Sequence, residues 1–203
     1  MIPVKKQVEP DDFEMKVRQK GRLWLKDHGL SLDDPKPQKL NLPPYWQPFN
    51  KVLWEKYSGT CAYLAIFFEF ATGASSTDHF IPKSKKLGDA YEWDNYRLSC
   101  LGPNRNKLNF EDVLDPFELV KDSFFINFLS GKMAPAQNLS ANMKRLAEAT
   151  IARLDLNSPQ CMKMRARHYQ NYEKGECSLN FLKRHSPFVY QEICRQNLIK
   201  AGT

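Results

Sequence analysis

The feature that most limits the fold of this chain is a proline-rich segment between residues 30 and 48. It contains five prolines: Pro35, Pro37, Pro43, Pro44 and Pro48. Proline fixes φ and lacks the backbone N–H that a helix interior requires, so no long helix can cross this segment. We expect the segment to wrap the surface or to reach toward a partner, because such segments can become ordered on binding.

The regions on either side of this segment show helical patterns. Residues 1–10 predict an extended arm. Asp11 and Asp12 can cap a following helix whose apolar side chains recur at helical spacing, and Gly29 can end it. Residues 49–57 predict a second, short helix.

Residues 60–110 predict a β-hairpin followed by a helix. The apolar and aromatic side chains at the start of this region favour strand structure, and glycine and proline punctuate its end. The expected elements are a strand or buried turn at 60–70, a returning strand at 76–81, a short helix at 95–100 capped by Asp94, a break at Gly102-Pro103 and a helical stretch at 104–108.

The remainder of the chain predicts mostly helices, because its apolar residues recur at helical spacing. The expected elements are two short strands within 117–129 closed by Gly131, and helices at 139–154, 161–172 and 181–199, the last interrupted at Ser186-Pro187. We therefore expect an α+β fold in which the hairpin and its helix are embedded in a mostly helical domain.

Composition narrows the function classes. Thirty Lys and Arg against 23 Asp and Glu give a net charge of +7, which favours polyanionic partners, although a solvated basic surface explains it equally well. No apolar run is long enough to cross a membrane, and no apolar leader opens the chain. Five scattered cysteines predict reduced thiols and a cytoplasmic protein. No glycine-rich phosphate loop supports a nucleotide-cofactor enzyme.

Polar residues between positions 78 and 107 are the candidates for metal binding and for proton transfer. A carboxylate and an amide oxygen can hold a hard cation such as Mg²⁺, and a neutral imidazole can take a proton from water near pH 7. Taken singly, each of these residues is an ordinary turn, cap or surface residue. Their order and spacing together favour a metal-dependent phosphodiester-cleaving site. The residues are Asp78, His79, Asn95, Asn104 and Lys107.

This pattern resembles the HNH endonucleases, whose shared ββα-metal core is a β-hairpin plus a helix around one divalent ion. The resemblance implies that His79 is the general base and that Asp78 and Asn104 bind Mg²⁺ or Mn²⁺. It also implies that Asn95 braces the hairpin and orients His79. Lys107 falls where the motif has a lysine and could contact a phosphate.

Basic residues near the motif are weaker candidates for nucleic-acid contacts. They are Lys83, Arg105 and Lys107. DNA is the expected substrate. The alternative is a catalytically inactive module that binds nucleic acid or a partner on an HNH scaffold.

One feature departs from many HNH proteins, which carry two Cys-x-x-Cys pairs around a structural zinc. Each pair retains only its first cysteine here, Cys61 and Cys100, while Leu64 and Pro103 occupy the second positions. Two thiolates alone do not complete a tetrahedral site. We therefore expect no structural zinc, with apolar side chains filling its place.

The flanking sequence resembles the HNH nuclease subunit of the Septu anti-phage defence systems and related retron-linked effectors. The residues that carry this resemblance include 54–63, 113–117 and 149–157. It implies an antiviral role with an ABC-type ATPase as partner. The chain is then expected to divide into three regions. These are an N-terminal arm, helix and partner-docking segment at 1–59, an HNH nuclease core at 60–110 and a helical C-terminal elaboration at 111–203.

Overall fold

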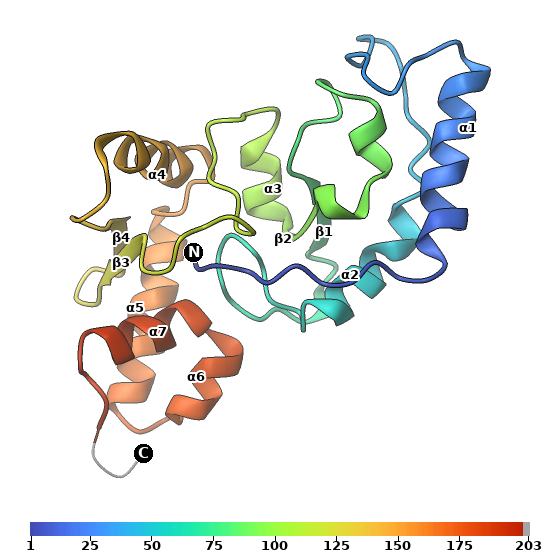
Figure 1. Ribbon diagram of the computed structural model, residues 1–203. Helices are drawn as coiled ribbons and strands as arrows, with labels where there is room; N and C mark the ends of the chain where they lie inside the picture. The colour runs from blue at the N-terminus through green and yellow to red at the C-terminus, as the bar shows by residue number, and fades with distance from the viewer. Residues whose placement is uncertain (201–203) are drawn as a thin grey trace.

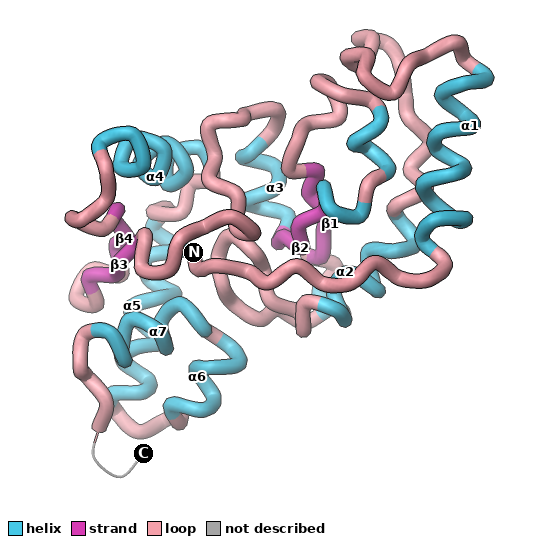
Figure 2. The backbone as a smooth tube through the Cα atoms, in the orientation of Figure 1, coloured by secondary structure: helices cyan, strands magenta, loops and turns pink. Residues whose placement is uncertain are grey.

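The computed structural model describes residues 1–200, and its fold is α+β (Figure 1). These residues form seven α-helices and two antiparallel hairpins, joined by long irregular connections (Figure 2). The elements are α1 (Gln19–Asp27), α2 (Asn50–Lys56), β1 (Ser75–His79), β2 (Tyr96–Cys100), α3 (Leu101–Lys107), β3 (Phe124–Asn127), β4 (Lys132–Pro135), α4 (Ala141–Arg153), α5 (Pro159–Glu173), α6 (Leu179–His185) and α7 (Pro187–Arg195). None of the helices in residues 1–200 has both the length and the apolarity that a membrane crossing requires.

The first helix begins as a π-helical turn at Glu14–Arg18 and continues as α1. Phe13 and Val17 are buried as the helical spacing predicts, and Gly29 follows the helix with a φ of 67°. No side chain caps its start. The expected aspartate cap is therefore not formed, and Asp12 instead pairs with Lys16 at 2.7 Å.

Within α1, Gly21 allows an unusually close contact. A Cβ atom at this position would lie 2.2 Å from the ring of Tyr91. Tyr91 ends a short 3₁₀-helix, η4 (Gly88–Tyr91), which lies in the connection between β1 and β2. Because glycine has no side chain, the helix and the aromatic ring can touch directly.

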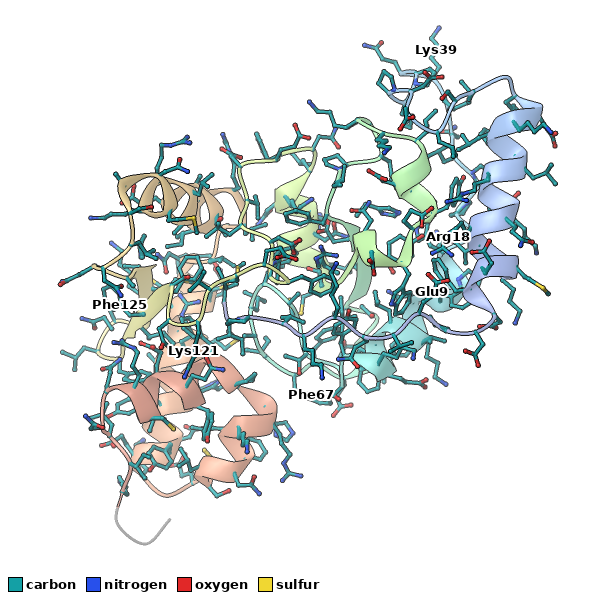
Figure 3. All side chains as sticks on the ribbon, in the orientation of Figure 1. Glu9, Arg18, Lys39, Phe67, Lys121 and Phe125 are labelled. Atoms are coloured by element: carbon teal, nitrogen blue, oxygen red, sulfur yellow. The ribbon has the colours of Figure 1, made fainter. Side chains whose placement is uncertain are left out.

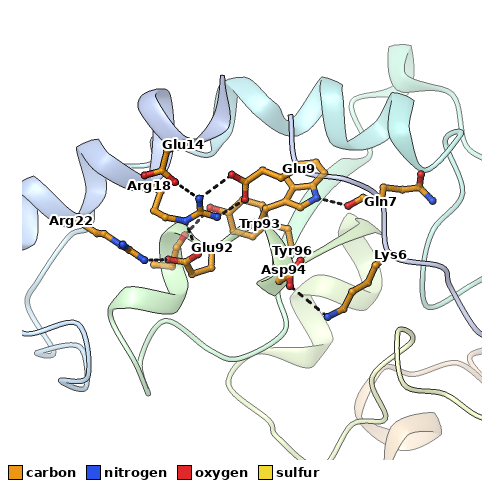
Figure 4. A network of polar contacts seen from close by, with 11 residues as sticks. Lys6, Gln7, Glu9, Glu14, Arg18, Arg22, Glu92, Trp93, Asp94 and Tyr96 are labelled. Atoms are coloured by element: carbon orange, nitrogen blue, oxygen red, sulfur yellow. Dashed lines mark hydrogen bonds and ion pairs between the residues drawn. The ribbon is translucent and has the colours of Figure 1, made fainter. Parts of the chain in front are cut away.

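The N-terminal arm packs across the middle of the molecule (Figure 1). The Trp93 indole donates to the Gln7 carbonyl oxygen at 2.9 Å. Arg18 pairs with Glu9 of the arm (Figures 3 and 4). It also pairs with Glu92 of the connection between β1 and β2 (Figure 4). The arm thus links α1 to the loop that precedes β2.

The proline-rich segment contains no helix longer than a 3₁₀ turn at Gln47–Phe49, as its composition predicts. It wraps the first half of the chain rather than extending from it. Trp46 is buried in the core, and the carbonyl oxygen of Pro43 accepts a hydrogen bond from the Tyr91 hydroxyl at 3.2 Å.

The first hairpin pairs β1 with β2 in antiparallel register, with Asp78 opposite Arg97 and His79 opposite Tyr96. The strand predicted at 76–81 is present, but its partner was predicted wrongly. Residues 60–70 form turns with one bridge, and the helix expected at 95–100 is instead strand β2. The reason is long-range pairing, which overrides the local capping signal at the start of the segment.

Helix α3 follows β2 without a loop. Gly102 and Pro103 lie in the first turn of this helix instead of breaking it, because a proline in the first turn forfeits no intrahelical hydrogen bond. The consequence is that residues of β1 and of α3 lie against each other, and Asn104 reaches the backbone of Thr77.

The second hairpin, β3–β4, packs against the C-terminal helices. Of the two strands predicted within 117–129, β3 lies inside this range, whereas β4 begins after it, and Gly131 occupies the turn between them with a φ of 69°. The predicted helices are present as α4, α5 and the pair α6–α7, and the interruption at Ser186-Pro187 is confirmed. Serine hydroxyls cap α4, α5 and α6 by accepting from backbone N–H groups.

Side chains form hydrogen bonds with backbone groups at both outer edges of this second hairpin. On β3, the Ile126 N–H donates to the Glu192 carboxylate at 2.8 Å, and Gln196 donates to the Ile126 carbonyl oxygen at 2.9 Å. On β4, Asn157 bonds to both the N–H and the carbonyl of Met133, at 2.9 and 2.8 Å. The strand edges are therefore closed by side chains in place of further strands.

Candidate active site

A polar cavity of about 210 Å³ lies where β1 meets α3 and the loop after β1. It is lined by Thr77, Asp78, His79, Pro82, Lys83, Asn104, Leu108 and Asn109. Four residues predicted from the sequence as site residues are thus brought together here: Asp78, His79, Lys83 and Asn104. The other three, Asn95, Arg105 and Lys107, do not line this cavity.

His79 is held in one orientation at the end of β1. Its ring contacts Trp46 and Tyr96 edge-on, with ring centroids 4.7 and 5.0 Å apart. Its Nε2 lies 3.0 Å from the carbonyl oxygen of Ala90. Because a carbonyl oxygen can only accept, Nε2 carries the proton and Nδ1 is left as an unprotonated acceptor.

The electrostatic surroundings keep this imidazole neutral. Burial, together with the nearby ammonium group of Lys83, lowers the pKa of His79 to about 3, although the hydrogen bond to the Ala90 carbonyl opposes this shift. The ring is therefore a neutral acceptor throughout the physiological range.

Asp78 is buried beside His79, with only 3% of its surface exposed. One carboxylate oxygen accepts a hydrogen bond from the Tyr63 hydroxyl, and the other lies 3.4 Å from the Lys107 ammonium. Burial raises the pKa of this carboxyl, and the charge of Lys107 opposes that effect. These two partners fix the orientation of the carboxylate.

Lys107 is completely buried on α3. Its ammonium donates to the carbonyl oxygens of His79 and Phe80, at 3.1 and 2.8 Å. This placement differs from the expectation that Lys107 contacts a phosphate, because its charge faces the end of β1 from inside the protein. Helical spacing gave no sign that this lysine would point into the core.

Asn104 projects from α3 toward β1. Its amide nitrogen donates to the Ser76 hydroxyl and to the Thr77 carbonyl oxygen, the latter at 3.5 Å. These contacts direct the nitrogen at the strand, so the amide oxygen is the atom that can accept from or coordinate a ligand in the cavity.

Asn95 acts through the loop between the two strands. Its amide oxygen accepts from the Ile81 N–H at 2.7 Å, and its nitrogen donates to the carbonyl oxygens of Ile81 and Asp89, at 3.0 and 2.8 Å. These bonds tie the start of the loop to its end. Since Ala90 follows Asp89, they also fix the carbonyl group that holds His79. Arg105 lies exposed on α3.

Three contributors to the site were not predicted from the sequence. They are Tyr63, which binds Asp78, Trp46, which packs on His79, and the carbonyl group of Ala90. The Lys83 ammonium lies 4.5 Å from the centroid of the Trp46 ring, and burial lowers the pKa of that lysine. Trp46 lies in the proline-rich segment, where the adjacent aromatic residues Tyr45 and Trp46 were the available signal.

The donor set of the cavity suits a hard divalent cation. Within residues 1–200, no group of three or more His, Cys, Asp and Glu side chains gathers into a metal site. The candidate metal ligands in the cavity are therefore one carboxylate, from Asp78, and one amide oxygen, from Asn104. Mg²⁺ binds through one or two protein oxygens together with waters and substrate phosphates, so this sparse set fits that ion.

The cysteines of the half-retained pairs lie near each other. The sulfur of buried Cys61 accepts from the backbone N–H groups of Cys100 and Leu64, at 3.3 and 3.4 Å. Pro103 is buried and Leu64 is partly buried against the core. The thiols are thus part of the packing between the 60–70 turns and the first hairpin.

The cavity as a whole combines a neutral proton acceptor, two oxygen donors and an ammonium group. Such a set can deprotonate water, bind a hard cation and attract an anionic substrate. Neither a protein-family model nor a curated protein matches the chain.

Proposed function

We propose that this protein is a metal-dependent endonuclease of the HNH type that hydrolyses DNA phosphodiester bonds. One observation carries the proposal: unprotonated Nδ1 of His79, the carboxylate of Asp78 and the amide of Asn104 belong to residues that line one cavity. The antiparallel β1–β2 pair followed directly by α3 supports the finer assignment to a ββα-metal core.

In the proposed reaction, His79 takes the proton from the attacking water. The Ala90 carbonyl holds Nε2, so Nδ1 is presented as the base, and burial keeps the ring unprotonated before the reaction. Trp46 and Tyr96 restrict the rotation of the ring. A fixed base of this kind reduces the entropy lost on reaching the transition state.

Asp78 and Asn104 would hold Mg²⁺ or Mn²⁺. When bound, the ion supplies charge neutralisation on the phosphate and on the departing oxygen. Tyr63 and Lys107 orient the Asp78 carboxylate, and Ser76 orients Asn104. The half-buried ammonium of Lys83 attracts the anionic substrate to the cavity.

Plasmid cleavage in Mg²⁺, Mn²⁺ and EDTA tests this function. We expect His79→Ala to lower the nicking rate by about 10³-fold, in the range typical of a lost general base. Asp78→Asn and Asn104→Ala should lose activity and respond more weakly to added metal. The matched control is His28→Ala, which removes an exposed histidine that does not line the cavity. Normal nicking by purified His79→Ala would refute the mechanism.

The cellular setting is proposed from the resemblance of the flanking sequence. It comprises a cytoplasmic anti-phage complex in which an ABC-type ATPase restrains or licenses the nuclease. Co-expression of the two chains followed by size-exclusion chromatography tests this pairing, and separate elution under all nucleotide conditions counts against it.

A non-catalytic binding module is the second candidate, and the surroundings of Asp78 favour it. Both carboxylate oxygens already have protein partners, Tyr63 and Lys107, so Asp78 could be purely structural. Calorimetric titration with Mn²⁺ separates the two readings. A nuclease loses Mn²⁺ binding in Asp78→Asn, whereas a binding module binds nucleic acid equally well in EDTA and cleaves none under any metal.

A further inference from the structure

A second polar cavity of about 330 Å³ lies beside the first along the outer edge of β1. It is lined by Trp46, Gln47, Asn50, Ser75, Ser76 and Thr77. Thr77 lines both cavities, so the two are adjacent along the strand. Among the described strands, β1 pairs with β2 alone, and its other edge is not covered by a strand.

The lining of this second cavity offers hydroxyl donors. The hydroxyl of Ser75 is buried and has no hydrogen-bond partner within residues 1–200. The hydroxyls of Thr77 and Ser76 accept from the amides of Asn50 and Asn104, and the Asn50 bond is 3.2 Å long. Accepting uses an oxygen lone pair and leaves each O–H free to donate. A buried hydroxyl without a partner calls for a ligand or a water in its place.

The charge around the two cavities favours an anion. Among the residues that the structure describes, no acidic side chain lines the second cavity, and Asp78 is the sole acid lining the first. Within residues 1–200, Lys83 forms no ion pair, although it is half-buried over the Trp46 ring. Trp46 itself lines the second cavity. Adjacent hydroxyl donors and an unpaired ammonium match phosphate oxygens, which only accept hydrogen bonds.

We propose that the second cavity binds a backbone phosphate that neighbours the scissile phosphate on the same nucleic-acid strand. Ser75 and Thr77 donate to its oxygens, and Lys83 attracts the adjacent phosphate in the first cavity. This inference rests on the proposed function, since it takes the first cavity as the place of cleavage. It predicts a substrate with at least two consecutive phosphodiesters.

Binding without cleavage tests the subsite. Thymidine dinucleotide carries one phosphodiester and the trinucleotide carries two, and both are titrated in EDTA with ¹⁵N-labelled protein. We expect the dinucleotide to shift amide signals near His79 and Lys83, and the trinucleotide to shift those of Ser75 and Thr77 as well. The trinucleotide should bind about tenfold more tightly, the effect of hydrogen bonds to a charged group.

The variant Ser75→Ala should reduce the ratio of trinucleotide affinity to dinucleotide affinity to near one. It removes a hydroxyl that has no protein partner, so its melting temperature should not fall. The matched control, Ser130→Ala, changes an exposed serine in the turn between β3 and β4 and should keep the tenfold ratio. Equal ratios in the two variants, or unmoved Ser75 and Thr77 signals, overturn the subsite.

The outcomes also separate the subsite from the proposed function. Plasmid nicking with no extra affinity for the trinucleotide leaves the nuclease in place and removes the subsite. An intact affinity ratio without nicking under any metal keeps a phosphate-binding track and removes the catalytic assignment.

Discussion

The two hairpins both bring charged side chains into the protein, but they use them differently. At β3–β4, Glu192 and Asn157 bond to strand backbone groups, and both outer edges are closed. At β1–β2, Lys107 holds the strand end from inside, while Asp78 and His79 also line a cavity. The second hairpin thus uses its polar side chains for structure, whereas two cavities along β1 leave room for a ligand beside fixed polar groups.

The largest expected effect comes from breaking the buried pair at the first hairpin. Lys107→Met leaves the Asp78 carboxylate with Tyr63 as its remaining partner and removes two bonds to the β1 end. We expect the free energy of unfolding to fall by about 4 kcal/mol, as measured by urea denaturation. The exposed Lys121→Met is the control, and a loss below about 1 kcal/mol would show that the pair contributes little.

The corresponding change at the second hairpin is Glu192→Ala. It leaves the Ile126 N–H and the Arg195 guanidinium without their carboxylate. We expect a loss of about 3 kcal/mol in unfolding free energy, because a buried hydrogen bond to a charged group is removed. Nicking per folded molecule should stay unchanged. Glu192→Gln retains an acceptor and should recover most of the stability; lost nicking at full stability would contradict the division between the hairpins.

A smaller effect concerns pH and the stability of the metal-free protein. The pKa of His79 is about 3 in the folded protein and about 6.5 when unfolded. Below pH 6.5 the unfolded chain therefore takes up a proton that the folded protein does not, and stability falls with pH. Between pH 7 and pH 5 this contributes about 2 kcal/mol.

The comparison of wild type with His79→Ala isolates this contribution. Urea denaturation in EDTA at the two pH values should show a loss that is smaller in the variant by about 2 kcal/mol. Equal losses would mean that His79 is solvated and titrates normally. The same low pKa predicts that His79 causes no change in nicking rate between pH 6 and pH 8.

The smallest effect should come from the outer edge of β4. Asn157→Ala removes the side chain that bonds to both backbone groups of Met133. We expect a loss of about 1 kcal/mol in unfolding free energy, because water can replace part of these contacts. Hydrogen exchange at the Met133 amide should quicken selectively. Unchanged exchange there would show that Asn157 does not close the edge.

Local patterns predicted much of this fold. The C-terminal helices, the proline-rich segment and a strand ending near His79 follow from short-range signals. Strand β2 did not, because Asp94 and Asn95 resemble a helix start, and only pairing with β1, across the intervening loop, makes the segment extended.

The motif likewise identified residues that share a cavity, namely Asp78, His79 and Asn104. It could not identify their supports. Tyr63 and Trp46 reach the site through tertiary packing, and the burial of Lys107 depends on which face of α3 meets β1. Such contacts have no fixed spacing along a sequence, so they become visible only in three dimensions.

The bare surface of Gly21 has a consequence at a distance. Because Gly21 has no side chain, the Tyr91 ring contacts the backbone of α1 directly, and this contact sets the distance between α1 and η4. Ala90 precedes Tyr91 in η4, and its carbonyl oxygen accepts the hydrogen bond from Nε2 of His79. A methyl group at position 21 would therefore push Tyr91 away from α1 and shift the neighbouring Ala90 carbonyl. A substitution in α1 would thus change the orientation of the His79 imidazole.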